Sequence, residues 1–203
     1  MKKYTFTLLI VLLSNTFISA KTYKGAELRT NSTFKYGRFE VRMKSVEMSG
    51  MLSSFFTYHE ISSLADWNEI DIEIMGRYND EVQFNTITPN QTNHVYEYAS
   101  EFNPHNDFHV YAIEWTPHYV AWFVDSVEVY RQTEEHISTL YRAQKLMMNI
   151  WPPNSVDWAG NFDASELPAY AFYDWVQYYA YTPGEAETFT LQWRDDFNSY
   201  NPG

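Results

Sequence analysis

The sequence predicts an all-β protein with the fold of a β-sandwich or jelly roll. Between residues 36 and 44, the apolar side chains of Phe39, Val41 and Met43 alternate with charged ones, the period of a strand with one buried face. Short apolar segments recur at regular spacing, and no convincing long helix interrupts them. The 203 residues, 45% of them hydrophobic, suit one domain with one core.

The expected strands follow one another along most of the chain. They are residues 36–44, 51–58, 69–75, 82–88, 108–115, 120–124, 145–150, 171–179 and 189–193. Residues typical of turns separate them, at 48–50, 76–80, 88–90 and 151–154. Residues 182–187 contain Pro183 and Gly184 and predict a surface connection before the last strand. The sequence shows no internal repeat.

The first twenty residues have the organisation of a signal peptide. Lys2 and Lys3 precede the apolar residues 4–13, and small residues at Ser19-Ala20 offer a cleavage site. The alternative is a membrane anchor, but an apolar run of about ten residues is too short to span ~30 Å of hydrocarbon as a helix. We therefore expect residues 1–20 to be removed, and residues 21–203 to form a secreted domain without membrane association.

Composition excludes several classes of function. The chain has 14 Lys+Arg and 26 Asp+Glu, a formal net charge of −12, which disfavours binding to nucleic acid. It has no cysteine, which excludes disulfides, thiolate metal sites and a cysteine nucleophile. No pair of its six histidines has zinc-ligand spacing on a helix. Aromatic residues make up 19% of the chain, more than a core of this size requires, so some are expected in a cleft or on the surface.

The chemistry is concentrated in the strand at residues 69–75. Because side chains alternate along a strand, Trp67, Glu69, Asp71 and Glu73 share one face, while the intervening isoleucines fill the core. Neighbouring like charges destabilise a sheet and raise each other's pKa values. The alternative is a solvated acidic face. Trp67 argues against it, because an indole is costly to leave in water unless something stacks on it.

Two carboxylic acids of unlike protonation are what glycoside hydrolysis needs. A retaining enzyme places a nucleophilic carboxylate and a general acid about 5–5.5 Å apart. The Cα atoms of Glu69 and Glu73 are roughly 13 Å apart in a regular strand, so their long side chains must lean together over a concave sheet. The shorter Asp71 then lies beneath them, where its charge helps to keep the acid protonated.

The motif Glu69-Ile70-Asp71-Ile72-Glu73 resembles the signature of glycoside hydrolase family 16, and its surroundings resemble the bacterial licheninases, endo-1,3-1,4-β-glucanases. Its single residue between Asp71 and Glu73 is similar to licheninases and plant xyloglucan transglycosylases, whereas laminarinases, agarases and carrageenases usually have two. Further matching segments are residues 36–40, 53–58, 82–85, 108–111, 114–117, 147–151 and 173–176. The resemblance implies a jelly-roll sandwich of the concanavalin-like type with a concave cleft.

The resemblance also implies roles for individual residues. Glu69 would be the nucleophile and Glu73 the general acid and base, with Asp71 assisting. The positions similar to sugar-binding residues are Arg29, Phe56, Tyr58, Trp67, Gln83, Asn85, Trp151 and Trp158. Asp174 matches a ligand of one structural calcium ion, and no catalytic cofactor is implied.

Some of these positions have plainer alternatives. Phe56 and Trp158 can be core aromatics, and Gln83 and Asn85 can make contacts between strands. Asp174 alone is weak evidence for calcium, which takes six to eight oxygen ligands.

The order of the segments resembles a circularly permuted licheninase from a rumen bacterium. Residues 193–200 follow the catalytic core, whereas most licheninases have a similar segment at the amino terminus, before a strand like residues 25–30. The permuted relative continues for several tens of residues beyond the point that matches Gly203. The resemblance therefore implies either a sequence truncated at its C-terminus or a sandwich that lacks the further strands of this portion.

The expected function is a secreted, monomeric, endo-acting retaining β-glucanase that hydrolyses mixed-linkage 1,3-1,4-β-D-glucan. One alternative is a family-16 enzyme for another β-glucan, such as laminarin or xyloglucan. The other is a non-catalytic glycan-binding sandwich, which needs the aromatic residues but has no use for Glu69, Asp71 and Glu73 together.

Overall fold

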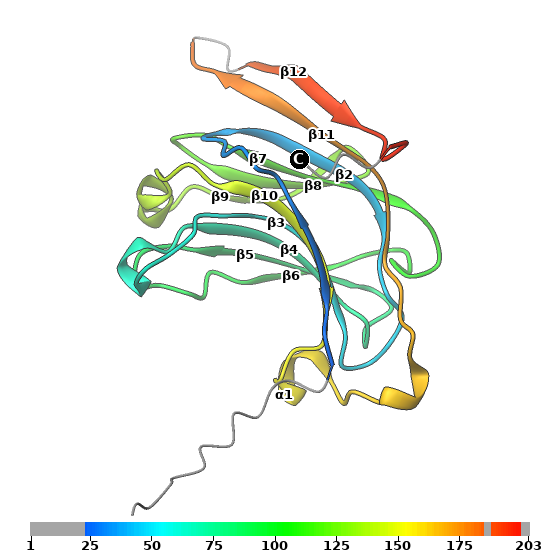
Figure 1. Ribbon diagram of the computed structural model, residues 1–203. Coiled ribbons are helices and arrows are strands. Elements are labelled where there is room, and N and C mark those ends of the chain that lie inside the picture. Colours follow the sequence, from blue (N-terminus) through cyan, green and yellow to red (C-terminus); the bar gives the residue numbers. More distant parts are fainter. Residues whose placement is uncertain (1–22, 185–187, 200–203) are drawn as a thin grey trace, which may run out of the picture.

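The protein is a sandwich of two antiparallel sheets (Figure 1). The computed structural model describes residues 23–184 and 188–199. The first sheet, here the cleft sheet, contains in spatial order β1 (Ala26–Arg29), β10 (Lys145–Trp151), β3 (Leu52–Tyr58), β4 (Glu69–Met75), β5 (Glu81–Ile87) and β6 (Tyr96–Ala99). The back sheet contains β12 (Thr188–Asp195), β11 (Phe172–Thr182), β2 (Gly37–Lys44), β7 (His109–Trp115), β8 (Val120–Val124) and β9 (Val127–Gln132). The predicted all-β sandwich is confirmed.

In the part of the chain that the structure describes, helical structure is confined to short connections. The helix α1 (Val156–Ala159) lies beyond the ends of the strands in Figure 1. Three short 3-10 helices occupy other connections, η1 (Leu64–Asp66), η2 (Glu135–Thr139) and η3 (Ala164–Glu166). Within residues 23–184 and 188–199, no helix is long and apolar enough to cross a membrane.

All nine expected strands are present, and β4 and β8 have the predicted bounds. Periodicity did not reveal β1, β6 and β9. β1 and β6 are four-residue, largely exposed edge strands, too short to show an alternation. β9 follows β8 through Asp125 and Ser126, both at positive φ, a tight hairpin turn without the glycine that usually marks one. Of the predicted connection at 182–187, Thr182 ends β11 and residues 185–187 lie outside the described part.

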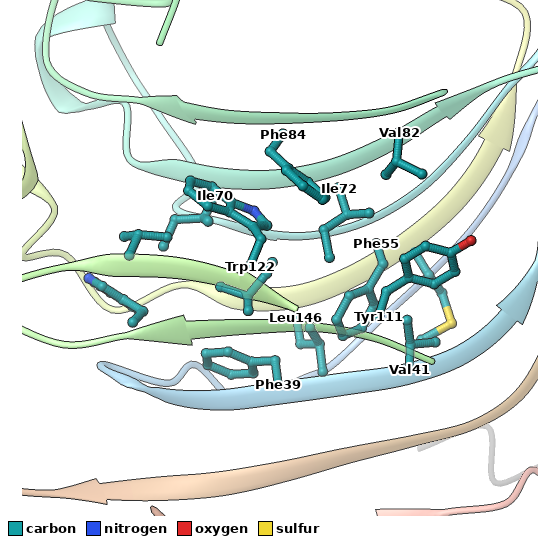
Figure 2. Packing of buried hydrophobic residues seen from close by; sticks show 14 of the residues in the cluster. Phe39, Val41, Phe55, Ile70, Ile72, Val82, Phe84, Tyr111, Trp122 and Leu146 are labelled. Atoms are coloured by element: carbon teal, nitrogen blue, oxygen red, sulfur yellow. The ribbon is translucent and has the colours of Figure 1, made fainter. Parts of the chain in front are cut away.

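The core lies between the two sheets. Figure 2 shows Ile70, Ile72 and Phe84 of the cleft sheet facing Phe39 and Trp122 of the back sheet. All five side chains are fully buried, as the alternation in β2 and β4 predicts. The Trp122 ring stacks on Phe84 with 5.5 Å between centroids. Its Nε1 donates a hydrogen bond to the backbone oxygen of Asp71 at 3.0 Å, so the back sheet is tied to the middle of β4.

Pairing in the cleft sheet sets which side chains stand together on its outer face. Glu69 lies opposite Tyr58 on β3, and Asp71 opposite Phe56 on β3. Glu73 lies opposite Gln83 on β5. Directly paired residues point to the same side of a sheet. The outer face of β4 therefore presents its three carboxylates between aromatic residues on one neighbouring strand and amides on the other.

Candidate active site

The three carboxylates of β4 have different hydrogen-bond partners. Glu69 accepts from the indole Nε1 of Trp67 and from the carboxyl group of Asp71. Glu73 Oε2 accepts from Gln83 Nε2 at 2.6 Å. The Asp71 side chain is buried beneath this surface, with 4% exposure for the residue. The aspartate lies between and beneath the glutamates, as predicted. The predicted charge on Asp71 is not found, because burial favours its protonated form, which donates to Glu69.

Burial and mutual repulsion shift the protonation of all three groups. Burial raises the pKa of Glu69 to about 7, against hydrogen bonds from Trp67 and Asp71 that stabilise its carboxylate. Burial raises the pKa of Glu73 to about 8, and the charge of Glu69 adds to the increase. The pKa of Asp71 is well above its ordinary value because of burial and then the two glutamate charges. Glu69 therefore ionises before Glu73, which stays protonated beside it.

A cleft of about 750 Å³ lies over these groups. Its wall includes residues that the sequence analysis missed. Ile87 pairs with Glu69 across β4 and β5, and Glu97 pairs with Gln83 across β5 and β6, so knowledge of strand pairing is needed to find them. The other lining residues not predicted are Asn93, His94 and Val95, from the segment after β5, which carries no periodic signal.

Gln83 and Asn85 both line the cleft, and both also contact protein groups. Gln83 connects Glu73 to Trp158, whose indole Nε1 donates to Gln83 Oε1 at 3.0 Å. The Oδ1 atom of Asn85 accepts from the backbone nitrogen of His94 at 2.9 Å. Its Nδ2 donates to the oxygen of Thr92 at 3.4 Å. Asn85 thus holds the segment that forms one wall of the cleft.

The predicted aromatic residues lie at different depths, and of them Trp158 alone lines the cleft over the acids. Phe56 packs beside Asp71 with 8% exposure and is largely a buried residue. Tyr58 stands beside Glu69, and Trp67 is half-buried against the same carboxylate. Trp151 ends β10, and its ring lies edge-on to Trp158 with 6.4 Å between centroids.

Arg29 shares this face but is distant from the acids. It lies on β1, which β10 and β3 separate from β4. Its register partner is Met147, which in turn pairs with Phe56, so the arginine is on the same side of the sheet as Asp71. Its guanidinium contacts the Glu60 carboxylate at 3.2 Å. A role in binding sugar at this end of the face stays a prediction.

Asp174 belongs to the back sheet, away from the cleft. It lies on β11, and its Oδ2 is 2.5 Å from Arg42 Nη1. Among the residues that the structure describes, no group of three histidine, aspartate or glutamate side chains is placed to hold a metal ion. Asp174 is paired with Arg42, and calcium binding there stays a prediction.

Known proteins that are similar to this chain are named β-glucanases. The chain is 40% identical over 199 residues to a β-glucanase of Fibrobacter succinogenes, covering 92% of this chain and 56% of the relative. It is 42% identical over 163 residues to a β-glucanase of Brevibacillus brevis, covering 79% and 62%. The chain thus spans between about half and two thirds of the length of these relatives.

Solved structures agree with the fold and with the family of these relatives. A β-1,3-1,4-glucanase (lichenase) from a mouse hindgut metagenome superposes with a TM-score of 0.68 at 42% identity, over 75% of this chain and 70% of that one. A Bacillus licheniformis β-glucanase gives 0.69 at 36% identity, with the same coverage. The model of glycosyl hydrolases family 16 matches residues 5–177. Together with the acid motif on β4, this match over most of the sequence places the chain in glycosyl hydrolase family 16.

Proposed function

We propose that the protein is a secreted, endo-acting β-glucanase that hydrolyses mixed-linkage 1,3-1,4-β-D-glucan with retention of anomeric configuration. The observation that carries the proposal is the pair Glu69 and Glu73, two carboxyl groups in one cleft whose surroundings make the first ionise before the second. The β-glucanase and lichenase relatives at about 40% identity support the choice of substrate.

The chemistry follows from the positions of the two glutamates. The Glu69 carboxylate attacks the anomeric carbon while Glu73 gives its proton to the departing glycosidic oxygen. The resulting ester between Glu69 and the sugar is then hydrolysed by a water molecule, from which Glu73 removes a proton. Hydrogen bonds from Trp67 and Asp71 orient the Glu69 oxygens and stabilise the charge that returns when the ester breaks.

The surroundings of the acids suit a neutral polysaccharide. Tyr58 and Trp67 offer ring surfaces on which the C–H faces of a sugar can pack. Across the cleft, the amide of Asn93 and the carboxylate of Glu97 offer partners for hydroxyl groups. The net charge of −12 disfavours anionic polysaccharides but does not oppose an uncharged glucan.

A reducing-sugar assay on lichenan, laminarin, xyloglucan and carboxymethylcellulose tests this function. The proposal predicts release from lichenan with little from the other three, and a mixture of oligosaccharides early in the reaction because cleavage is internal. Glu69→Ala is the matched inactive control. If the enzyme prefers laminarin or xyloglucan, it is still a glycoside hydrolase, but the proposed substrate is wrong. Binding to lichenan without any release of reducing sugar would contradict the proposal.

A further inference from the structure

A chain of hydrogen bonds connects Glu73 to a residue outside the sheet. Gln83 Nε2 donates to Glu73 Oε2 at 2.6 Å, and Trp158 Nε1 donates to Gln83 Oε1 at 3.0 Å. An indole nitrogen can only donate, so it selects the carbonyl oxygen of the Gln83 amide. The NH₂ group of the amide must then face Glu73. The orientation of Gln83 is therefore fixed by a tryptophan that is 75 residues away in the sequence.

The position of Trp158 is itself fixed from the end of β4. The Arg77 Nη1 atom donates to three successive carbonyl oxygens of α1, those of Val156, Asp157 and Trp158, at 3.4, 3.0 and 3.3 Å. Arg77 follows Glu73 by four residues and comes directly after Gly76. The contacts form a closed ring, from Glu73 along β4 to Arg77, through α1 to Trp158 and Gln83, and back to Glu73.

We propose that Gln83 and Trp158 are positioning residues for Glu73, which keep its carboxyl group oriented toward the glycosidic oxygen, and that Arg77 holds Trp158 in place for this purpose. The inference rests on the proposed function, because it assigns Glu73 the role of acid and base. It differs from the sequence-based prediction that Trp158 and Gln83 bind sugar, since it gives the indole N–H and the amide a task within the protein.

The physical reason is that the Glu73 carboxyl group acts in both steps of the reaction, first as an acid and then as a base. Glu73 must hold a proton in the first step and accept one in the second. An N–H donor on Oε2 leaves the proton to the other oxygen, Oε1, in both steps. Without the Trp158 donor, the Gln83 amide is free to turn and present its oxygen to Glu73 instead. The carboxylic proton would then be drawn to Gln83 and away from the glycosidic bond.

The test compares two leaving groups. Departure of a sugar from lichenan needs the proton of Glu73, whereas a 2,4-dinitrophenyl group on a lichenan-derived oligosaccharide leaves without one. Trp158→Phe removes the indole donor and keeps a smaller aromatic ring in the cleft. We expect kcat/KM on lichenan to fall about tenfold or more, since general acid catalysis contributes on the order of 10²–10⁴. On the dinitrophenyl glycoside, kcat/KM should stay within about twofold of the unsubstituted enzyme.

Trp67→Phe is the matched contrast. It also removes one indole donor beside a glutamate, but the affected glutamate is Glu69. Because the nucleophile attacks whichever group leaves, both substrates should lose activity together. Gln83→Leu provides a second way to break the chain of hydrogen bonds, with the same selective loss as Trp158→Phe. Either variant decides the question if its circular dichroism matches that of the unsubstituted protein.

Equal loss on both substrates in Trp158→Phe and Gln83→Leu would overturn the positioning role and indicate that they serve sugar binding. Unchanged activity on both would overturn it too. An unsubstituted protein that cleaves neither substrate would refute the proposed function, and the role for Glu73 would be refuted with it. Activity on lichenan with no selective loss would refute the positioning role alone.

Discussion

At the scale of single residues, the protein gives two identical side chains on one strand different chemistry. Glu69 receives hydrogen bonds from Trp67 and Asp71, and both stabilise its carboxylate. Glu73 receives one from Gln83 and also feels the charge of Glu69, which favours its protonated form. Two carboxyl groups whose surroundings separate their pKa values are what a retaining glycosidase needs.

Chemical rescue distinguishes the roles of the two glutamates. In Glu69→Ala, azide should attack from the face that the nucleophile occupied and give an α-glycosyl azide. In Glu73→Ala, azide should replace the activated water and give the β-azide. The azide products of an activated aryl glycoside can be identified by NMR. If the two products are exchanged between the variants, the roles of the glutamates are reversed.

Trp67→Phe should also change the pH dependence of the reaction. The indole donor lowers the pKa of Glu69, so its removal should raise that pKa. The acidic limb of kcat/KM would then move to higher pH, because more alkaline conditions are needed to ionise the nucleophile. A sugar contact of the Trp67 ring stays a prediction. An unmoved acidic limb together with a raised KM would favour that contact over the hydrogen bond.

The acids should make the folded protein less stable as pH rises. The pKa of Glu73 is raised to about 8 in the folded state from an ordinary value of 4.5. Between these values the folded state holds a proton that the unfolded state has lost, so the free energy of unfolding falls with increasing pH. Glu73→Gln should therefore raise Tm by about 3 °C or more at pH 8 and by little at pH 4.5. Calorimetry across this range, with the exposed Glu135→Gln as control, checks the prediction; equal effects of Glu73→Gln at both pH values would contradict it.

The acid motif could be predicted from the sequence because every part of it lies on one strand. Alternation alone places Glu69, Asp71 and Glu73 on one face and buries the isoleucines behind them. Partners of the acids from other parts of the chain could not be predicted in this way. Trp158 reaches the site from a four-residue helix, and the segment at 93–95 is placed by contacts with Asn85.

At the scale of elements, alternation and turn residues predict where strands lie in the sequence, but not which strands pair in a sheet. β4 and β8 have the predicted bounds, and a turn directly follows each of them, at residues 76–77 and 125–126. The sequence does not reveal that β10 lies between β1 and β3, because this pairing joins segments more than 80 residues apart. The strand order decides which side chains lie next to one another across the cleft sheet.

The turn between β2 and β3 gives a prediction at this scale. Gly50 has a φ of +79°, and its nitrogen donates to the oxygen of Ala159 at 2.7 Å. A Cβ atom there would lie 2.4 Å from the Cα of Phe162. Gly50→Ala should lower stability by about 2 kcal/mol, or Tm by about 4–8 °C, because of backbone strain and this close contact. Ser49→Ala, at an exposed neighbour, is the control in thermal unfolding. Equal small changes in the two variants would show that the glycine is not required.

At the scale of the whole molecule, the back sheet supports the fold and the cleft sheet carries the acids. The back sheet supports β4 through the bond from Trp122 to the backbone of Asp71, and the shared core stabilises the layers. The outer face of the cleft sheet therefore does not have to pack against another layer of the fold. It can carry the carboxyl groups of the cleft instead. Such groups are costly for stability, as expected of a site selected for chemistry. The segment order that resembles a permuted licheninase, and a continuation beyond Gly203, stay predictions.

The stereochemistry of hydrolysis tests the central claim most directly. If Glu69 forms a covalent intermediate and Glu73 then activates water, two displacements at the anomeric carbon return it to its original configuration. Proton NMR of the first products from lichenan, recorded before mutarotation, should show the β-anomer. The α-anomer as first product would mean a single displacement and would contradict the roles assigned to Glu69 and Glu73.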